Sequence, residues 1–405
     1  MEMYLCLLLL CGVVHGLNNG LARTPPMGFL SWERFRCNLD CKNDPENCVS
    51  EHLYKSIADV IVAEGYRDLG YEYVNIDDCW PAKTRDAAGR LQPDPNRFPS
   101  GMHNLSQYMH ARGLKLGIYE DFGKRTCAGY PGSEFFLRTD ANTFAEWEID
   151  LLKFDGCNSD PKDMDIGYPL MEFFLNQTGR PFLFSCSWPA YIVGTLKKVP
   201  NYTAIKEHCN IWRNYDDIQD SWDSALKIID YYGENKGNFA GVAGPGGFND
   251  PDELLVGDFG LSYDQQKVQF GMWAMMASPL FISTDLRKIK PEFKAILQNK
   301  RVIAINQDPL GAQATQLYKA STIQVWLKPL AVNGTLAVAI LNTDNQGEPA
   351  KITLNPKQIG ALSPNGVNIT ETFDNIYVGA FKPTETFTLS INPTGIFLAT
   401  VVPLA

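Results

Sequence analysis

After its first residues, the chain has no apolar run long enough to cross a membrane. A transmembrane helix needs about 20 apolar residues, and Leu5 to Val14 is shorter than that. Val14-His15-Gly16 offers small residues for cleavage, although no Lys or Arg precedes the apolar run. We therefore predict a cleaved signal peptide over residues 1–16, with a buried N-terminal strand as the alternative. A secreted chain without stable membrane insertion is expected.

Motifs for metals and nucleotides are also missing. The chain has no Cys-x-x-Cys, and its 5 histidines are scattered, which disfavours zinc. No Gly-x-Gly-x-x-Gly follows the first predicted strand, which counts against a nucleotide-binding sheet. Gly244-Pro245-Gly246-Gly247 follows no clear strand and is typical of a turn. No metal or cofactor is predicted.

Positive charge is scarce as well. With 36 basic and 46 acidic residues the chain has a formal charge of −10, which disfavours nucleic acid or an anionic membrane as partner. An apolar share of 45% against 20% charged residues is enough for a folded core. The acidic balance suits a secreted or lysosomal protein that works at low pH.

Cysteines and sequons agree with export. An even number of cysteines follows the predicted signal, which suits an oxidising compartment but leaves the pairing open. These are Cys37, Cys41, Cys48, Cys79, Cys127, Cys157, Cys186 and Cys209. The N-glycosylation sequons lie at Asn104, Asn176, Asn201, Asn333 and Asn368.

Strand-like and helix-like segments alternate from about Leu21 to Pro309. Ser50 is a suitable N-cap for the first clear helix, and further helices are predicted over 105–112, 141–148 and 265–277. Counting eight strands, with the weakest at 247–249, predicts a (β/α)₈ TIM barrel over 17–309; a doubly wound open sheet is the alternative. Short alternating strands such as 322–326 and 335–340, separated by turns, predict a C-terminal antiparallel β-sandwich over 310–405.

Four of the predicted barrel strands end in carboxylates. They are Tyr73 to Asp78, Leu151 to Gly156, Ile211 to Asp217 and Leu280 to Asp285. The carboxyl ends of barrel strands meet on one face, where active sites are built. Paired carboxylates with few basic residues beside them suit the cleavage of glycosidic bonds.

Asp155 and Asp217 are the candidate catalytic pair. Lys153 lies two residues before Asp155, on the same side of the strand, and a nearby cation would keep a nucleophilic carboxylate ionised. Asp217, on another strand end, could protonate the leaving oxygen and later activate water, with Arg213 nearby to bind a hydroxyl or the acid itself. The alternatives are a strand-end salt bridge and a helix-start cluster.

Further residues could hold a sugar. Asp77 and Asp78 would point to opposite sides if their strand continued through them, so that one faces the pocket. Carboxylates accept hydrogen bonds from vicinal hydroxyls, and Trp32 and Tyr119 could supply flat apolar faces.

Several motifs together resemble glycoside hydrolase family 27, which holds the retaining α-galactosidases and α-N-acetylgalactosaminidases. They are PMGFLSWERF at 26–35, NIDDCW at 75–80, LKFDGC at 152–157, WRN at 212–214, NDPD at 249–252 and INQDPLG at 305–311. The resemblance implies Asp155 as nucleophile and Asp217 as acid/base. It also implies sugar-binding roles for Trp32, Asp77, Asp78, Tyr119, Cys127, Lys153, Arg213 and Asp252, and disulfides Cys37–Cys79, Cys41–Cys48, Cys127–Cys157 and Cys186–Cys209.

The stretch from Ser185 to Tyr191 bears on the substrate. Animal α-galactosidases are similar here but carry Glu and Leu where this chain has Ser187 and Ala190. Small residues leave room for an N-acetyl group, with Ser187 bonding its amide and Ala190 touching its methyl. Terminal α-linked N-acetylgalactosamine on glycolipids and glycopeptides is therefore expected as substrate, with galactose admitted less well.

Two readings stay open beside this one, namely an α-galactosidase with little tolerance for the N-acetyl group and an inactive glycan-binding protein. The chain also departs from the family pattern: Phe29 and Phe248 replace tryptophans, Glu120 stands in place of Ala, and Glu253 in place of Met. Glu120 and Glu253 are expected to add charge at the rim. By analogy with the family, a homodimer in the lysosome is expected.

Overall fold

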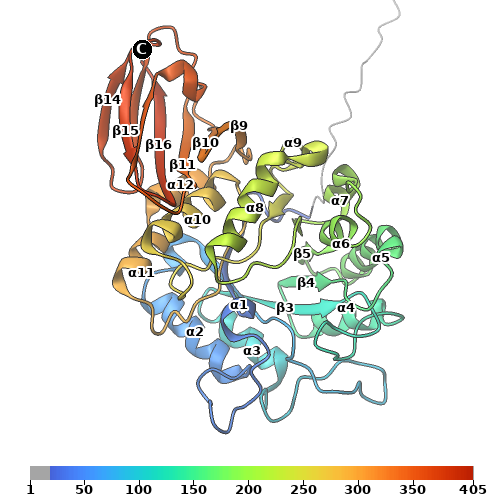
Figure 1. The fold of residues 1–405 in the computed structure, drawn as a ribbon. Helices are drawn as coiled ribbons and strands as arrows, with labels where there is room; N and C mark the ends of the chain where they lie inside the picture. The colour runs from blue at the N-terminus through green and yellow to red at the C-terminus, as the bar shows by residue number, and fades with distance from the viewer. Residues whose placement is uncertain (1–18, 405) are drawn as a thin grey trace, which may run out of the picture.

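The structure, a computed structural model, describes residues 19–404, which form a parallel barrel and a C-terminal antiparallel domain (Figure 1). The predicted signal peptide, residues 1–16, lies outside the described residues. The last helix of the barrel, α12 (Lys300–Asn306), and the first strand of the next domain, β9 (Thr315–Ala320), flank the boundary placed between residues 309 and 310.

The barrel contains eight parallel strands in the order β7-β6-β5-β4-β3-β2-β1-β8. A parallel bridge between Leu254 and Ile282 joins the segment after β7 to β8 and closes the ring. The TIM-barrel prediction is therefore confirmed, and the open doubly wound sheet is not formed. The strands are β1 (Met27–Leu30), β2 (Tyr71–Asn75), β3 (Lys115–Asp121), β4 (Leu151–Asp155), β5 (Leu183–Cys186), β6 (Ile211–Arg213), β7 (Phe248–Asp250) and β8 (Leu280–Ile282).

Helices lie between the strands and cover the outside of the barrel (Figure 1). Ser50 caps α2 as predicted, because its side chain accepts the N–H of Leu53. Helices α3, α4 and α10 begin two to four residues before the predicted starts, since apolar periodicity marks the middle of a helix better than its first turn. The remaining bounds are α1 (Trp32–Phe35), α2 (Glu51–Ala63), α3 (Gly101–His110), α4 (Leu137–Glu146), α5 (Met164–Gln177), α6 (Trp188–Gly194), α7 (Tyr202–His208), α8 (Trp222–Glu234), α9 (Phe239–Val242), α10 (Tyr263–Met275) and α11 (Pro291–Leu297).

Two apolar layers follow from the alternation of side chains along the barrel strands. One residue from each of seven strands fills the interior: Leu30, Tyr73, Leu151, Leu183, Ile211, Phe248 and Phe281. Their neighbours, such as Val74 and Leu152, join the larger core between strands and helices. A filled interior leaves the carboxyl ends of the strands as the place for a site.

The C-terminal domain packs against the barrel through α10. Its six-stranded sheet has the order β14-β13-β16-β11-β10-β9, and β12 pairs with β15 in a second sheet. Val338 and Ile340 of β11 face the core between the sheets, whereas Ala337, Ala339 and Leu341 face the barrel core. The other strands are β10 (Ile323–Pro329), β11 (Leu336–Asn342), β12 (Ala350–Leu354), β13 (Val367–Glu371), β14 (Tyr377–Phe381), β15 (Phe387–Ile391) and β16 (Gly395–Pro403).

The four disulfides pair as the resemblance implies: Cys37–Cys79, Cys41–Cys48, Cys127–Cys157 and Cys186–Cys209. Two of them join loops at the carboxyl ends of the strands. Cys37–Cys79 ties the segment after α1 to the segment after β2, and Cys127–Cys157 ties the loop after β3 to the loop after β4. These cross-links limit the freedom of the loops that carry the predicted site.

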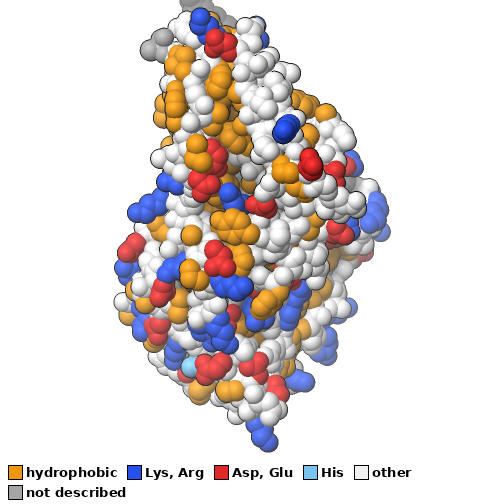
Figure 2. Space-filling model, turned by 60° about the vertical axis from the view of Figure 1, so that its left-hand side comes forward, with side chains coloured by type: hydrophobic (Ala, Val, Ile, Leu, Met, Phe, Trp, Pro, Cys, Tyr) orange, Lys and Arg blue, Asp and Glu red, His pale blue; other side chains and the backbone are white. Residues whose placement is uncertain are grey.

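The surface carries both signs of charge side by side. On the face shown in Figure 2, acidic and basic side chains are interspersed over the barrel, and the C-terminal domain carries fewer of them. Among residues 19–404, no helix combines the length and apolar character that crossing a bilayer requires. Four of the sequon asparagines are exposed and Asn368 is half-buried, so their glycosylation stays a prediction.

Candidate active site

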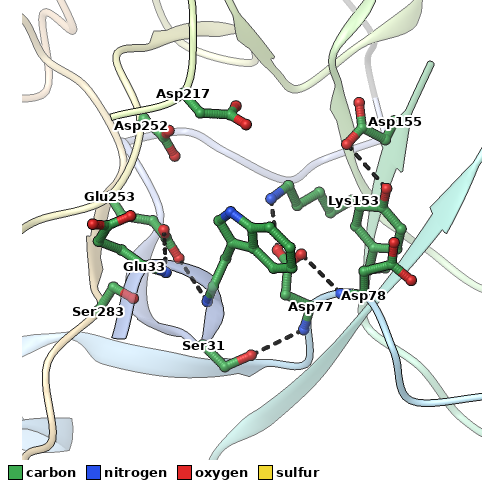
Figure 3. A network of polar contacts seen from close by, with 12 residues as sticks. Ser31, Glu33, Asp77, Asp78, Lys153, Asp155, Asp217, Asp252, Glu253 and Ser283 are labelled. Carbon is green, nitrogen blue, oxygen red and sulfur yellow. Dashed lines mark hydrogen bonds and ion pairs between the residues drawn. The ribbon is translucent and has the colours of Figure 1, made fainter. Parts of the chain in front are cut away.

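The predicted site residues gather at the carboxyl ends of neighbouring barrel strands. Asp77 and Asp78 follow β2, Tyr119 lies near the end of β3, Lys153 and Asp155 end β4, and Ser187 follows β5. Arg213 ends β6, and Asp252 follows β7. Figure 3 shows the side chains of Asp77, Asp155, Asp217 and Asp252 around that of Lys153. The topology thus brings together groups that are far apart in the sequence.

Asp155 is held by three donors. Its Oδ1 accepts hydrogen bonds from the Tyr191 hydroxyl at 2.8 Å and from the N–H of Gly156 at 2.8 Å. Its Oδ2 accepts one from the Tyr119 hydroxyl at 3.0 Å. Burial, followed by the charge of Asp155, raises the pKa of both tyrosines, so both stay protonated and donate. These bonds fix the direction of the carboxylate.

The expected flat face of Tyr119 is not available to a ligand. The residue is 1% exposed, so it offers its hydroxyl to Asp155 instead of its ring to a sugar. The ammonium of Lys153 contacts Asp77 Oδ2 at 2.6 Å and has no ion pair with Asp155, so the alternative of a strand-end salt bridge between Lys153 and Asp155 is not formed. Strand β4 lies two strands away from β2, and side chains of barrel strands meet across the interior.

Asp77 and Asp78 lie beyond the end of β2, so the alternation rule does not apply to them. Asp77 is buried, and its N–H donates to Ser31 Oγ at 3.1 Å. Burial raises the pKa of Asp77, although the positive charge of Lys153 acts in the opposite direction. Asp78 accepts from the N–H of Cys79 at 2.6 Å and of Ala128 at 2.9 Å. Burial raises the pKa of Asp78 to about 6.

Arg213 joins two carboxylates. Its Nη2 lies 3.1 Å from Asp217 Oδ1 and 2.9 Å from Asp252 Oδ2. The side chain of Asp217 is 64% exposed, and the charge of Arg213 lowers its pKa. Asp252 is buried, accepts the N–H of Ile218 at 2.8 Å, and has a φ of 84°, which is rare outside glycine. Such strain persists where the surrounding contacts over-determine the backbone.

A cavity of about 430 Å³ contains both proposed catalytic carboxylates. Its lining comprises Cys127, Asp155, Cys157, Ser187, Ala190, Tyr191, Gly194, Thr195, Arg213, Tyr215, Asp216 and Asp217. The volume is within the ~300–1,000 Å³ of small-molecule sites. Asp77, Tyr119, Lys153 and Asp252 are tied to each other or to the lining by the contacts described above, and the N–H of Asp78 donates to Asp77 Oδ1 at 2.8 Å.

Glu253 and Glu120 are not at the rim, which corrects the sequence prediction. Both are buried, at 1% and 0% exposed, and burial raises the pKa of each well above its usual value. Glu253 accepts the N–H groups of Trp32 at 3.2 Å and of Glu33 at 3.0 Å (Figure 3). It therefore anchors the half-buried Trp32, which does not line the cavity.

The sequence did not single out Asp121 as a residue close to the candidate nucleophile. Asp121 ends β3, accepts the N–H of Cys157 at 2.9 Å, and has a pKa raised to about 9 by burial and by the charge of Asp155. The signal was available, since β3 also ends in carboxylates. Sulfurs of Cys127 and Cys157 lie near Asp121, but their disulfide prevents them from acting as thiolate ligands.

The lining of the cavity also differs in part from the set of residues predicted from the sequence. Gly194 and Thr195 line the cavity although they lie at the end of α6 and follow no strand directly, whereas Tyr215 and Asp216 belong to the carboxylate run from Ile211 to Asp217. Asp285 ends one of the four carboxylate runs, yet it pairs with Arg287 at 2.7 Å and does not line the cavity. Three of the four runs therefore contribute to the site.

Known proteins resemble the chain over nearly its whole length. Residues 24–308 match the family described as "Alpha galactosidase A", and residues 311–395 match its "C-terminal beta sandwich domain". The chain is 50% identical to "Alpha-N-acetylgalactosaminidase" of Gallus gallus over 391 residues, with 96% of each chain covered. It is also 50% identical to human "Alpha-galactosidase A" over 387 residues, which cover 94% of this chain and 89% of the relative.

Solved structures agree with the fold. Alpha-galactosidase I from Mortierella vinacea superposes with a TM-score of 0.85 at 32% sequence identity. The match covers 96% of this chain and 99% of that one.

Proposed function

Since the chain belongs to the alpha-galactosidase A family, glycoside hydrolase family 27, and is a glycosidase, we propose that it releases terminal α-linked N-acetylgalactosamine from glycolipids and glycopeptides with retention of configuration. Galactose is expected as a poorer substrate. The observation that carries the mechanism is that Asp155, at the end of β4, and Asp217, in the segment after β6, line one sugar-sized cavity. Two carboxyl groups on either side of the scissile bond are what a retaining glycosidase needs.

In the first step, Asp155 attacks the anomeric carbon while the bond to the leaving oxygen breaks. Asp217 gives its proton to that oxygen, and a glycosyl ester with Asp155 forms. Hydrogen bonds from Tyr119, Tyr191 and the backbone of Gly156 hold the nucleophile in position.

In the second step, a water molecule attacks the anomeric carbon and passes a proton to the carboxylate of Asp217. The ester bond breaks and Asp155 returns to its carboxylate form. Arg213, 3.1 Å from Asp217, lowers the pKa of the acid/base, so the protonated form required in the first step is favoured in acid.

Ser187 and Ala190 are the proposed specificity residues. Both line the cavity together with Asp155, and their small side chains leave space where larger ones would fill it. Asp77, Asp78 and Lys153 are proposed to bind the sugar hydroxyls, because they present charged groups beside the nucleophile (Figure 3).

The alternative is an α-galactosidase, and the equal identity to a human enzyme of that name favours it as the second candidate. The deciding experiment is kcat/KM on the nitrophenyl α-glycosides of N-acetylgalactosamine and galactose. We expect the acetylated sugar to be preferred; a preference for galactose would establish the alternative. Binding without release would revive the inactive glycan-binding protein, which the presence of both carboxylates disfavours.

An acidic compartment such as the lysosome is the proposed location. Burial raises the pKa of Asp250 to about 6, of Asp258 to about 8 and of Asp121 to about 9, so the folded protein takes up protons readily. A homodimer is proposed by analogy with the family, and sedimentation of the mature chain tests it.

A further inference from the structure

A second cavity opens beside the one that contains the catalytic pair. Its volume is about 570 Å³, and Gly194, Tyr215 and Asp216 line both cavities. The rest of its lining comes from the end of α6 and the segment after it, and from α8 with the residues that follow it: Val193, Lys197, Lys198, Val199, Pro200, Lys227, Asp230, Tyr231, Glu234 and Lys236. The shared residues make the two cavities neighbouring parts of one surface.

Positive charge is concentrated there. Within residues 19–404, Lys197, Lys198 and Lys227 have no carboxylate partner. The acids of the lining are partly neutralised, because Glu234 pairs with Lys236 at 2.6 Å and Asp230 with Lys319 at 2.8 Å. On a chain with a net charge of −10, unpaired lysines around one pocket oppose the overall field.

The pocket also has an aromatic wall. The rings of Tyr215 and Tyr231 stack with their centroids 4.6 Å apart, and Tyr215 is half-buried. Aromatic rings offer flat apolar surface to the faces of sugar rings, while lysines offer ammonium donors to an anion.

The second cavity lies on the side of the active site where the leaving group is expected. The acid/base must reach the glycosidic oxygen, so the leaving group lies on the side of Asp217. Asp217 directly follows Tyr215 and Asp216, which line both cavities. We propose that this second cavity binds the leaving saccharide, and that it selects one carrying a carboxylate. The inference rests on the proposed function, since it assigns the leaving-group side of that site.

The test compares two substrates that differ in one charge and one methyl group. One is α-N-acetylgalactosamine linked to a disaccharide that contains glucuronic acid, and the other is its methyl ester. At pH about 5 a carboxyl of ordinary pKa is mostly ionised. We expect a higher kcat/KM for the acid, by about 1.4- to fivefold for each lysine engaged, which is the effect of an exposed ion pair. Raising the salt concentration should reduce the ratio.

The variant Lys197→Glu/Lys227→Glu should bring the acid-to-ester ratio to about one or below. Lys42→Glu/Lys351→Glu is the matched control, since it changes the net charge equally at exposed lysines outside the lining and should keep the ratio. An acid-to-ester ratio at or below one in the unmodified protein, or equal ratios in both variants, would overturn the inference. Failure to hydrolyse even the neutral nitrophenyl glycoside would instead refute the proposed function, and the inference with it.

Discussion

Replacing Arg213 by Met should move the pH profile of the reaction. Arg213 Nη2 lies 3.1 Å from Asp217 Oδ1 and its charge lowers the pKa of that carboxyl. Without the cation the pKa rises, so Asp217 keeps its proton to higher pH. The alkaline limb of kcat/KM, which reports the acid in the free enzyme, should shift upward.

The size of this pKa shift depends on how exposed the side chain of Asp217 is. Because the side chain of Asp217 is 64% exposed, solvent screens the pair, and an exposed ion pair contributes about 0.2–1 kcal/mol. At about 1.4 kcal/mol per pKa unit, the shift should be roughly 0.1–0.7 pH units. Asp252 is different, since its side chain is 4% exposed and lies 2.9 Å from Arg213. Breaking this buried pair should lower the free energy of unfolding by about 3–5 kcal/mol at neutral pH.

The assay is kcat/KM on the nitrophenyl glycoside from pH ~3 to ~8, together with urea unfolding of the same samples. Arg213→Lys is the matched variant, because it keeps the charge but loses the guanidinium fork and should shift the limb less. An alkaline limb that stays in place or moves to lower pH in Arg213→Met would refute the role of Arg213 on Asp217.

Two further predictions concern selectivity and stability. Ser187→Glu with Ala190→Leu should shift the kcat/KM ratio towards galactose by about tenfold or more, because larger side chains fill the space beside the N-acetyl group; unchanged selectivity would show that these residues do not define the pocket. The melting temperature should be higher at pH ~5 than at pH ~7.5. Burial raises the pKa of several acids, to about 6 for Asp78 and to about 9 for Asp121. Between pH ~5 and pH ~7.5 the folded state therefore binds more protons than the unfolded state. Each group then lowers the free energy of unfolding by at most about 1.4 kcal/mol per pH unit while the pH lies below its pKa in the folded state, so Asp78 contributes up to pH ~6 and Asp121 throughout. A higher melting temperature at pH ~7.5 would contradict this sign.

The barrel could be predicted because its signals are local. Alternating strands and helices, the N-cap Ser50 and the carboxylates after strand ends are each visible within a few residues, and all appear in the structure. Even the weak seventh strand lies within one residue of its predicted position, as β7.

The contacts within the site were harder to predict because they depend on which strands face each other. The spacing placed Lys153 on the same side of its strand as Asp155, but it did not predict that the Lys153 ammonium contacts Asp77 across the barrel. Glu253 was expected at the rim beside Asp252, yet it is buried and accepts hydrogen bonds from the N–H groups of Trp32 and Glu33. The spacing of residues within one segment predicts neither their distance to residues on other strands nor how deeply they are buried.

The stereochemistry of the first product tests the central claim, that Asp155 forms a covalent bond to the sugar opposite Asp217. Proton NMR during hydrolysis of the nitrophenyl α-glycoside should show the α-anomer of the free sugar first, with the β-anomer appearing only by mutarotation, and Asp155→Asn should abolish release while leaving the fold intact. An initial β-anomer, or undiminished release by Asp155→Asn, would contradict it.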